Sequence, residues 1–317
     1  MIMKTALVTG AFGQDGYFLT KYLIELKNYH IICCGNRFNK TQSNIYNNKN
    51  IEIKKLDIKN DYEIYKIIKD HKPDELYHLA GFSSPLISWT KPKEAIDVNG
   101  MSTITFLEAI RLFSPKTKIF FASSAKIFGI PTQPQQDENT PIDSQDPYSL
   151  GKYIGHQAVR LYRKKFNVFA SNGILYNHES HLKNLNFVVY KICHYAKLLK
   201  QKKINKFSLL SFNSTIDFGD PRDYVEAMHL ILQQDKPNDY IISMNNSISI
   251  KEICLKVGKL IGISDLISHI EVPESSMNEN IVKFQGNNKK LKSIGWAPKF
   301  SINDTFKLIL NNITLRY

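Results

Sequence analysis

The chain has 317 residues, 43% of them hydrophobic and 22% charged, a composition that is ordinary for a soluble globular protein. No apolar run approaches the roughly 20 residues of a membrane span, and the N-terminus lacks the long apolar core and cleavage site of a signal peptide. The net charge of +13 comes from scattered lysines, so we expect no nucleic-acid partner, although a basic cleft for a phosphorylated ligand is compatible with it. The four cysteines lack metal-site spacing and fit buried thiols of a cytoplasmic protein, so we expect no metal.

A glycine-rich turn lies close to the start of the chain. Residues 4–9 are predicted to form a buried parallel strand, and residues 17–26 have the apolar period of a helix. Between them stand Gly10, Gly13 and Gly16 in the segment Gly-Ala-Phe-Gly-Gln-Asp-Gly. In a nucleotide-binding turn the first glycine permits the turn and the second lets backbone approach a pyrophosphate. The third lets the helix pack close to the strand, with its N-terminus toward the anion. The order of strand, glycines and helix therefore predicts a dinucleotide-binding unit.

The end of the second predicted strand, residues 30–35, bears on the choice of dinucleotide. An NAD enzyme usually places Asp or Glu there to hold the ribose hydroxyls, whereas this chain has Gly35, Asn36 and Arg37. An arginine without a neighbouring carboxylate favours a 2′-phosphate, hence NADP, with NAD as the alternative. Arg37 could also be a surface residue at the start of the polar segment 38–50, which is predicted to be a loop.

Further strands and helices alternate up to residue 175. Strands are predicted at 51–56, 75–79, 117–122 and 167–175, and helices at 61–69, 93–113 and 148–165. Small residues after the fourth strand, Ala80 and Gly81, would let the backbone pass under a cofactor. Asn99, in the helix 93–113, either ties backbone to the active-site region or is a satisfied core amide. The alternation predicts an α/β fold with a Rossmann-like, doubly wound parallel sheet over residues 1–175.

The pattern changes after residue 175. A polar turn is predicted at 176–180, helices at 186–200, 223–233 and 249–261 plus a last one after Trp296, and short strands at 207–210 and 240–243. We expect a smaller mixed α/β substrate domain over 176–317 that closes on the crevice, with some crossing back of the chain.

Proton-transfer chemistry is indicated by Tyr148-Ser-Leu-Gly-Lys152 at the start of a predicted helix. Residues four apart share one helix face. A phenol with a pKa of about 10 is a poor base at neutral pH, but a neighbouring ammonium favours the phenolate. Such a pair suits proton transfer with a sugar hydroxyl while a hydride moves. Ser123 and Ser124 end a predicted parallel strand, where side chains face the ligand crevice.

These motifs resemble those of the extended short-chain dehydrogenases that act on nucleotide sugars, and most closely those of the GDP-mannose 4,6-dehydratases. The matching segments are 10–16, 148–152, 172–180 (Asn-Gly-Ile-Leu-Tyr-Asn-His-Glu-Ser), 186–187 and 223–228. Gly-Gln-Asp-Gly and Asn-His-Glu-Ser are the most specific of them. The resemblance covers most of the chain and weakens after about residue 245.

The resemblance implies a reaction and a set of site residues. Hydride leaves C4 of the sugar for the nicotinamide, the C5 proton and the C6 hydroxyl are lost, and the hydride returns to C6. The implied catalytic residues are Ser124, Lys126, Tyr148 and Lys152. The implied cofactor contacts are Gly10, Phe12, Gly13, Gln14, Asp15, Gly16, Arg37, Asp57, Ile58, Leu79, Ala80, Gly81, Tyr148, Lys152, His178 and Lys183. The implied substrate contacts are Ser83, Ser84, Ser124, Asn177 and Asn186.

Four departures from the family pattern bear on function. Lys126 stands where the family has the glutamate that removes the C5 proton, and Lys183 keeps the charge of a family arginine without its bidentate fork. Ile216 replaces a phosphate-binding arginine, for which Arg222 or Lys283 could substitute. Paired arginines that help the family form tetramers are reduced to one, so a homodimer built on the Tyr148 helix is expected, with a tetramer possible.

Three functions follow from these residues. The first is an NADP-dependent nucleotide-sugar 4,6-dehydratase acting on a GDP-linked sugar, with Lys126 as the C5 base. The second is chemistry at C4 alone, as oxidoreductase or 4-epimerase, which needs no C5 base. The third is a dinucleotide-sensing protein without turnover, against which the intact Tyr148/Lys152 pair argues.

Overall fold

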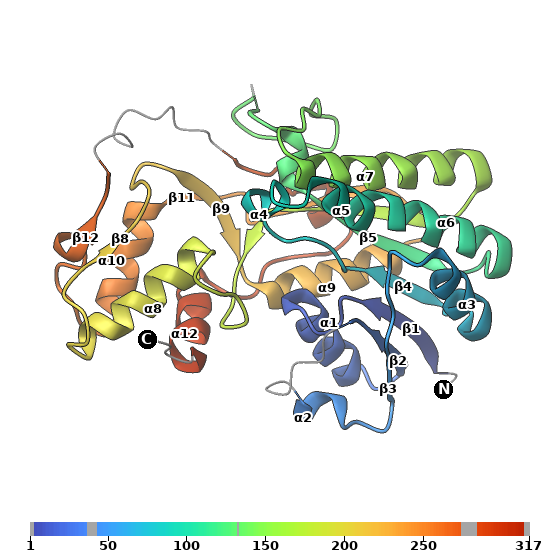
Figure 1. The fold of residues 1–317 in the computed structure, drawn as a ribbon, viewed down its shortest axis with the longest axis horizontal. Helices are drawn as coiled ribbons and strands as arrows, with labels where there is room; N and C mark the ends of the chain where they lie inside the picture. Colours follow the sequence, from blue (N-terminus) through green and yellow to red (C-terminus); the bar gives the residue numbers. More distant parts are fainter. Residues whose placement is uncertain (1–2, 37–42, 132, 274–283, 314–317) are drawn as a thin grey trace.

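A computed structural model describes residues 3–36, 43–131, 133–273 and 284–313. Its central element is a seven-stranded parallel sheet in the order β10-β6-β5-β4-β1-β2-β3 (Figure 1). The strands are β1 (Lys4–Thr9), β2 (Tyr29–Cys34), β3 (Ile51–Lys54), β4 (Glu75–His78), β5 (Lys118–Ser124), β6 (Ala170–Leu175) and β10 (Asp239–Ile242). The chain starts in the middle of the sheet, winds outward to β3, and then returns to build the other half, as predicted for a doubly wound sheet.

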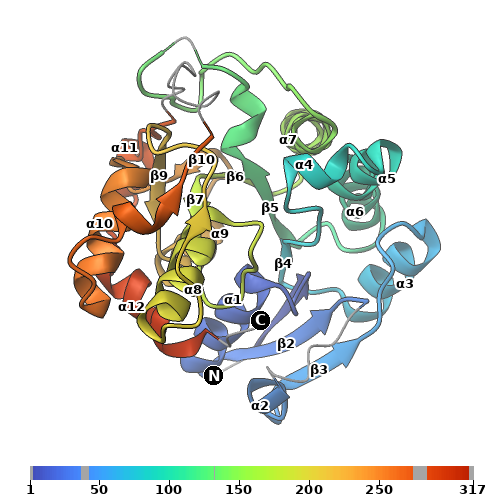
Figure 2. The same ribbon diagram turned by 60° about the vertical axis from the view of Figure 1, so that its left-hand side comes forward.

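Helices cover both faces of this sheet (Figure 2). One face carries α1 (Gln14–Glu25) and α9 (Pro221–Leu232), which pack against each other. The other carries α3 (Asp61–His71), α5 (Pro92–Ile96), α6 (Ser102–Phe113) and α7 (Pro147–Phe166). Except for the edge strand β3, the strands of the sheet are largely buried, as their continuous apolar runs predict. Although α9 and β10 follow residue 175, both belong to this layered unit, so the chain does cross back.

A second group of elements lies at one end of the molecule (Figure 1). It contains a three-stranded sheet of β7 (Asn177–His178), β9 (Thr215–Gly219) and β11 (Ser247–Ser249), and a pair formed by β8 (Phe207–Ser208) and β12 (Ile270–Glu271). Its helices are α8 (Val188–Lys200), α10 (Ile250–Ile261) and α12 (Ile302–Asn312), which share a separate apolar core. Short elements elsewhere are α2 (Ser43–Tyr46), α4 (Pro85–Ser88), the 3-10 turn η3 (Ala125–Phe128), η4 (Ile267–His269) and α11 (Lys289–Ser293).

Three local predictions need correction. Residues 43–46 form a helical turn inside the predicted loop 38–50, and the predicted polar turn after β6 is instead the strand β7, which pairs with β9. The single helix predicted over 93–113 is three consecutive pieces, α5, the π-helical turn η2 (Asp97–Met101) and α6. Asn99 lies in the π-turn, where its Oδ1 accepts a hydrogen bond from the Phe82 backbone N–H at 2.8 Å. The wider turn thus directs a buried amide at the loop after β4, as π-turns often do near functional sites.

The helix α7 begins where its sequence requires. Asp146 caps it by accepting from the Ser149 backbone N–H at 2.8 Å, the Ser149 side chain accepts from the Asp146 backbone N–H at 3.1 Å, and Pro147 occupies the first turn. Gly151 and Gly155 face η2 and β5 so closely that an added Cβ would lie within 3 Å of the Asn99 and Phe121 side chains. The N-terminal turn of α7 is therefore fixed against the sheet. No helix in the described residues is long and apolar enough to cross a membrane.

Candidate active site

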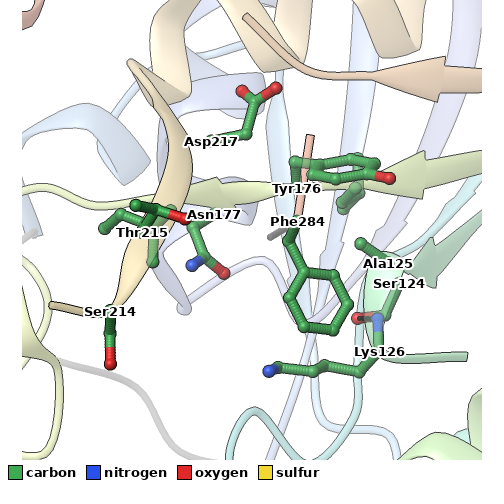
Figure 3. Close-up of a pocket in the computed structure, with 11 residues that line it drawn as sticks. Ser124, Ala125, Lys126, Tyr176, Asn177, Ser214, Thr215, Asp217 and Phe284 are labelled. Carbon is green, nitrogen blue, oxygen red and sulfur yellow. Dashed lines mark hydrogen bonds between the residues drawn. The ribbon is translucent and has the colours of Figure 1, made fainter. Parts of the chain in front are cut away.

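Two adjoining cavities lie beyond the carboxyl ends of β4, β5 and β6, where a parallel sheet is expected to hold its ligand. The α7 cavity, about 160 Å³, has walls from α1, the loop after β4, and α7. The β9 cavity, about 270 Å³, has walls from β9 and from the residues that follow β5 (Figure 3). Both are lined by Ser124, Leu175, Tyr176 and Asn177. A ligand of two parts could therefore occupy both cavities and pass between these four residues.

Tyr148 stands in the first turn of α7 and lines the α7 cavity. Ser124, at the end of β5, lines the same cavity. Burial raises the pKa of Tyr148 to about 12, although Ser124 acts in the opposite direction. The phenol is therefore protonated in the ligand-free protein, and a positive charge must arrive before it can act as a base near neutral pH.

Lys152 follows one turn later and is only 5% exposed. Its Nζ donates to the Ala122 carbonyl at 2.8 Å, and burial lowers the pKa of this lysine to about 8. A Cβ added to Gly81 would lie 3.3 Å from this Nζ, so the loop after β4 passes directly over it. The ammonium is thus held at the floor of the α7 cavity, within one helical turn of Tyr148.

Ser124 links the two cavities. It is 7% exposed, and its Oγ accepts from the Lys126 backbone N–H at 3.2 Å, which caps η3. Ser124, Tyr148 and Lys152 all line the α7 cavity, so a sugar oxygen bound there would lie near all three. Their catalytic roles stay a prediction.

Lys126 extends along the β9 cavity (Figure 3). Its Nζ lies 4.5 Å from the centroid of the Phe284 ring. Part of the side chain stays exposed, yet burial of the ammonium between the cavity walls lowers the pKa of Lys126, and Asp146 opposes this shift. Among the described residues that line the β9 cavity, Lys126 is the one cation. The side chain therefore lines the site while remaining exposed to solvent.

The glycine turn fits the pyrophosphate of a dinucleotide. Gly10 has a φ of +68°, and an added Cβ would lie 2.7 Å from the Ala80 nitrogen. A Cβ on Gly16 would lie 2.3 Å from the Gly10 carbonyl oxygen. Because these positions carry no Cβ, the first turn of α1 can come close to β1. The N-terminus of α1 is then open toward the loop after β4. Phe12 packs on Tyr46, and Gly13 is exposed at the helix start.

Several other predicted cofactor residues contact one another through hydrogen bonds. Asp15 Oδ1 lies 2.8 Å from His178 Nε2, and Gln14 Nε2 donates to the His178 carbonyl at 3.1 Å. Burial would raise the pKa of Asp15, but His178 and then Lys183 hold it well below its usual range. Asp15, His178 and Lys183 also line the α7 cavity. The two most specific motifs of the sequence therefore meet in space.

The remaining predicted residues are scattered around the site. Leu79 and Ser83 line the α7 cavity, the Leu79 and Ala80 nitrogens donate to Thr9 Oγ1 at 3.2 Å each, and Ser84 caps α4. Asp57 lines a groove beside the end of β2, and Ile58 is buried next to it. Asn177 lines both cavities, whereas Asn186 is exposed just before α8 and lines neither. Arg37 and Lys283 lie outside the described residues.

Sequence reasoning missed three residues of the β9 cavity. Phe284 covers Lys126, and Thr215 places a buried hydroxyl without a hydrogen-bond partner in the wall. Asp217, 1% exposed, accepts from the Met244 backbone N–H at 2.8 Å and from the Gly286 N–H at 3.1 Å. Burial raises the pKa of Asp217 to about 7, and these N–H groups counteract it. Asp217 thus connects the segments that carry Met244 and Gly286 to the wall of the β9 cavity. In the sequence, only the segment Asp217-Phe218-Gly219 could have drawn attention to this residue.

Comparison with known proteins agrees with this geometry. The model of the family described as GDP-mannose 4,6 dehydratase matches residues 7–309. GDP-mannose 4,6 dehydratase 1 of Arabidopsis thaliana is 33% identical over 324 residues, which cover 97% of this chain and 89% of the relative. The Homo sapiens GDP-mannose 4,6 dehydratase is 33% identical over 274 residues, covering 81% and 73%.

Solved structures share the fold. UDP-glucose 4-epimerase of Thermotoga maritima with UDP-glucose has a TM-score of 0.84 at 19% identity, covering 97% of this chain and 98% of that one. dTDP-glucose 4,6-dehydratase of Bacillus anthracis with NAD has a TM-score of 0.83 at 19% identity, covering 97% and 96%. At these identities the likeness shows the Rossmann-like fold alone. The family match over nearly the whole chain goes further, and the chain belongs to the GDP-mannose 4,6-dehydratase family of extended short-chain dehydrogenase enzymes.

Proposed function

We propose that the protein is a nucleotide-sugar 4,6-dehydratase that uses NADP and acts on a GDP-linked sugar. The observation that carries this proposal is the arrangement around Ser124: it shares one cavity with Tyr148 and Lys152, and the adjoining cavity with Lys126. A 4,6-dehydratase needs a proton acceptor at the C4 hydroxyl and a second one at C5. Family membership supports the same reaction and the GDP-linked sugar.

Chemistry at C4 belongs to Tyr148, Ser124 and Lys152. When bound, the dinucleotide accepts the hydride from C4 of the sugar and later returns it to C6. Ser124 would orient the C4 hydroxyl, and Tyr148 would take its proton. The Lys152 ammonium, buried one turn away, favours the phenolate in that step. Lys152 and the open N-terminus of α1 would hold the ribose and the pyrophosphate of the dinucleotide.

Chemistry at C5 and C6 belongs to Lys126. An amine can accept a proton only in its neutral form, and burial moves the pKa of Lys126 in that direction. The C4 ketone acidifies C5, so the amine needs to remove only an activated proton. The resulting ammonium then gives a proton to the departing C6 hydroxyl, which leaves as water. A solvent-derived proton adds at C5, and Tyr148 releases to solvent the proton that it took from the C4 hydroxyl, so the net products are the 4-keto-6-deoxy sugar and water.

The choice of NADP rests on the end of β2. Gly35 and Asn36 present no carboxylate where an NAD enzyme usually holds its ribose hydroxyls. Gly35 also lies against the Phe12 ring, which an added Cβ would approach to 2.8 Å. The described residues at the end of β2 therefore present no carboxylate that would repel a 2′-phosphate.

Chemistry at C4 alone, as an oxidoreductase or 4-epimerase, is the second candidate. It is favoured by the contact of the Lys126 ammonium with the Phe284 ring, because a cation–π contact stabilises the charged form that cannot act as a base. The Tyr148, Ser124 and Lys152 arrangement is sufficient for this chemistry.

Mass spectrometry of the nucleotide sugar separates these functions. We expect GDP-mannose incubated with the protein and NADP to lose one water. Tyr148→Phe should abolish turnover, whereas Tyr162→Phe, about 20 Å further along α7, should not. An unchanged mass with inversion at C4, or a loss of only two hydrogens through oxidation at C4, would establish the second candidate, and Lys126→Glu should then introduce water loss. Tight NADP binding without any sugar conversion, also with other nucleotide sugars, would indicate a sensor.

A further inference from the structure

Two segments about 160 residues apart in sequence meet beside the α7 cavity. Asp15 Oδ1 lies 2.8 Å from His178 Nε2, Gln14 Nε2 donates to the His178 carbonyl at 3.1 Å, and the Ser180 hydroxyl donates to Gln14 Oε1 at 2.9 Å. We call these four residues the α1–β7 junction. Gln14 and Ser180 are buried and His178 is half-buried, so the contacts are shielded from competing water.

His178 is held from every side that the structure describes. Its Nδ1 lies 2.7 Å from the Tyr176 carbonyl oxygen, while Nε2 faces the Asp15 carboxylate. Both ring nitrogens therefore lie within hydrogen-bond distance of oxygen atoms, which fixes the orientation of the ring. The ring also stacks on Tyr224 of α9, with centroids 4.2 Å apart. With these partners the side chain positions its own backbone rather than reaching freely into the cavity.

The junction leads directly to the wall of the β9 cavity. His178 and Asn177 form β7, and they pair with Gly219 and Phe218 of β9. The Tyr224 hydroxyl donates to the Asn177 carbonyl at 3.3 Å. The Asn177 side chain lines both cavities, and the first residues of β9 line the β9 cavity. An unbroken series of contacts thus runs from the start of α1 to the far wall of the site.

We propose that the α1–β7 junction is a positioning device that transmits dinucleotide binding at the start of α1 to β7 and β9. A bound pyrophosphate fixes the first turn of α1, and Gln14 and Asp15 in that turn then fix His178 and Ser180. Fixing His178 fixes β7 and its pairing partner β9, and this sets the shape of the β9 cavity for ligand binding. Because such coupling is reciprocal, the nucleotide sugar tightens dinucleotide binding by the same factor. The inference rests on the proposed function in taking NADP and a GDP-linked sugar as the two ligands.

Hydrogen exchange of the full chain, with and without NADP, tests this proposal. We expect NADP to protect residues 10–16 directly and residues 215–219 of β9 through the junction. The β9 segment is the informative one, because Thr215, Ile216 and Asp217 line the β9 cavity and not the α7 cavity. Asp15→Asn and, independently, His178→Gln should keep protection at 10–16 and lose it at 215–219. Glu226→Gln removes a carboxylate on α9 that pairs with Lys299, and it should change the protection of neither segment.

Ligand affinity gives the second readout. In the wild type we expect NADP to lower the Kd for GDP-mannose by at least about fivefold, the low end of typical coupling. Asp15→Asn should abolish this factor and raise KM for the sugar more than it lowers kcat. Protection at 10–16 without protection at 215–219 in the wild type would overturn the transmission while leaving the proposed function intact. Retained protection at 215–219 in both junction variants would also overturn it. Protection at neither segment would overturn both NADP binding and the junction's role.

Discussion

The helix that carries Tyr148 and Lys152 depends on a buried ion cluster, and Asp239→Asn tests its contribution. Asp239, at the start of β10, is 4% exposed. Its carboxylate accepts from Arg160 Nε at 2.6 Å and from Arg163 Nη1 at 3.0 Å, both on α7. Asn172 Nδ2 of β6 adds a hydrogen bond at 2.8 Å. The amide of an asparagine keeps the shape of the group but removes its charge.

The size of the effect follows from the pKa of Asp239. Burial alone would raise this pKa, but His156 and the two arginines lower it from 3.8 to about 2. At about 1.36 kcal/mol per unit, the charged carboxylate contributes about 2.4 kcal/mol to the free energy of unfolding. Because the folded-state pKa is depressed, the contribution is complete above about pH 5 and is lost as the pH falls through 4 toward 2. About 1 kcal/mol of it should be gone at pH 3.

Urea unfolding monitored by the fluorescence of the buried Trp296 measures this difference. We expect Asp239→Asn to lower the free energy of unfolding by about 2 to 5 kcal/mol at pH 7, the upper end arising if the arginines stay buried and unpaired. The difference in the free energy of unfolding between wild type and Asp239→Asn should be smaller by about 1 kcal/mol at pH 3. The control Asp235→Asn, an exposed residue just before β10, should stay within about 0.5 kcal/mol of wild type. A difference below that size at pH 7, or one independent of pH down to 3, would refute the reasoning.

Three further predictions concern the site and the assembly. Burial lowers the pKa of Lys152 to about 8 in the ligand-free protein, so kcat/KM should decline above pH 8 as the ammonium is lost. Lys152→Arg should remove that decline, because an arginine stays charged. A decline that persists in Lys152→Arg would exclude Lys152 as its source. Gly16→Ala puts a Cβ 2.3 Å from the Gly10 oxygen and should weaken NADP binding at least about fivefold by calorimetry; Gly13→Ala, whose Cβ lies 3.3 Å from the same oxygen, should weaken it less. We propose a homodimer built on α6 and α7, where Leu112 is 51% and Leu161 63% exposed. Leu161→Arg should then yield monomers in light scattering, whereas Leu210→Arg, on a residue 82% exposed near β8, should not; a Leu161→Arg dimer would exclude this face.

The parts of the site that the sequence predicted are those formed by local segments. Gly10 to Gly16 act within one turn, and Tyr148 and Lys152 lie four residues apart on one helix, so spacing alone places them together. Ser124 could be predicted as well, because the carboxyl ends of parallel strands share one edge. The relative positions of these residues are therefore set by local secondary structure, which a sequence pattern can predict.

The parts that escaped prediction depend on long-range packing. Phe284 reaches Lys126 from a segment that follows β12, and no local pattern connects the two. The π-turn at Asn99 breaks a helix whose apolar period looks continuous, because the amide is needed at Phe82. The turn predicted after β6 became a strand because β9 supplies a pairing partner there. Tertiary contacts therefore overrode local propensity at each of these positions.

The fate of the sugar hydrogens tests the central claim most directly. GDP-mannose carrying deuterium at C4 is incubated with the protein and NADP in ordinary water, and unlabelled GDP-mannose is incubated likewise in heavy water; each product is examined by NMR. A 4,6-dehydratase predicts a product lacking one water, with the C4 deuterium moved to C6 in the first case and a solvent deuterium at C5 in the second. A product that retains its C6 hydroxyl and takes up no deuterium at C5 would contradict the role of Lys126 and limit the enzyme to chemistry at C4.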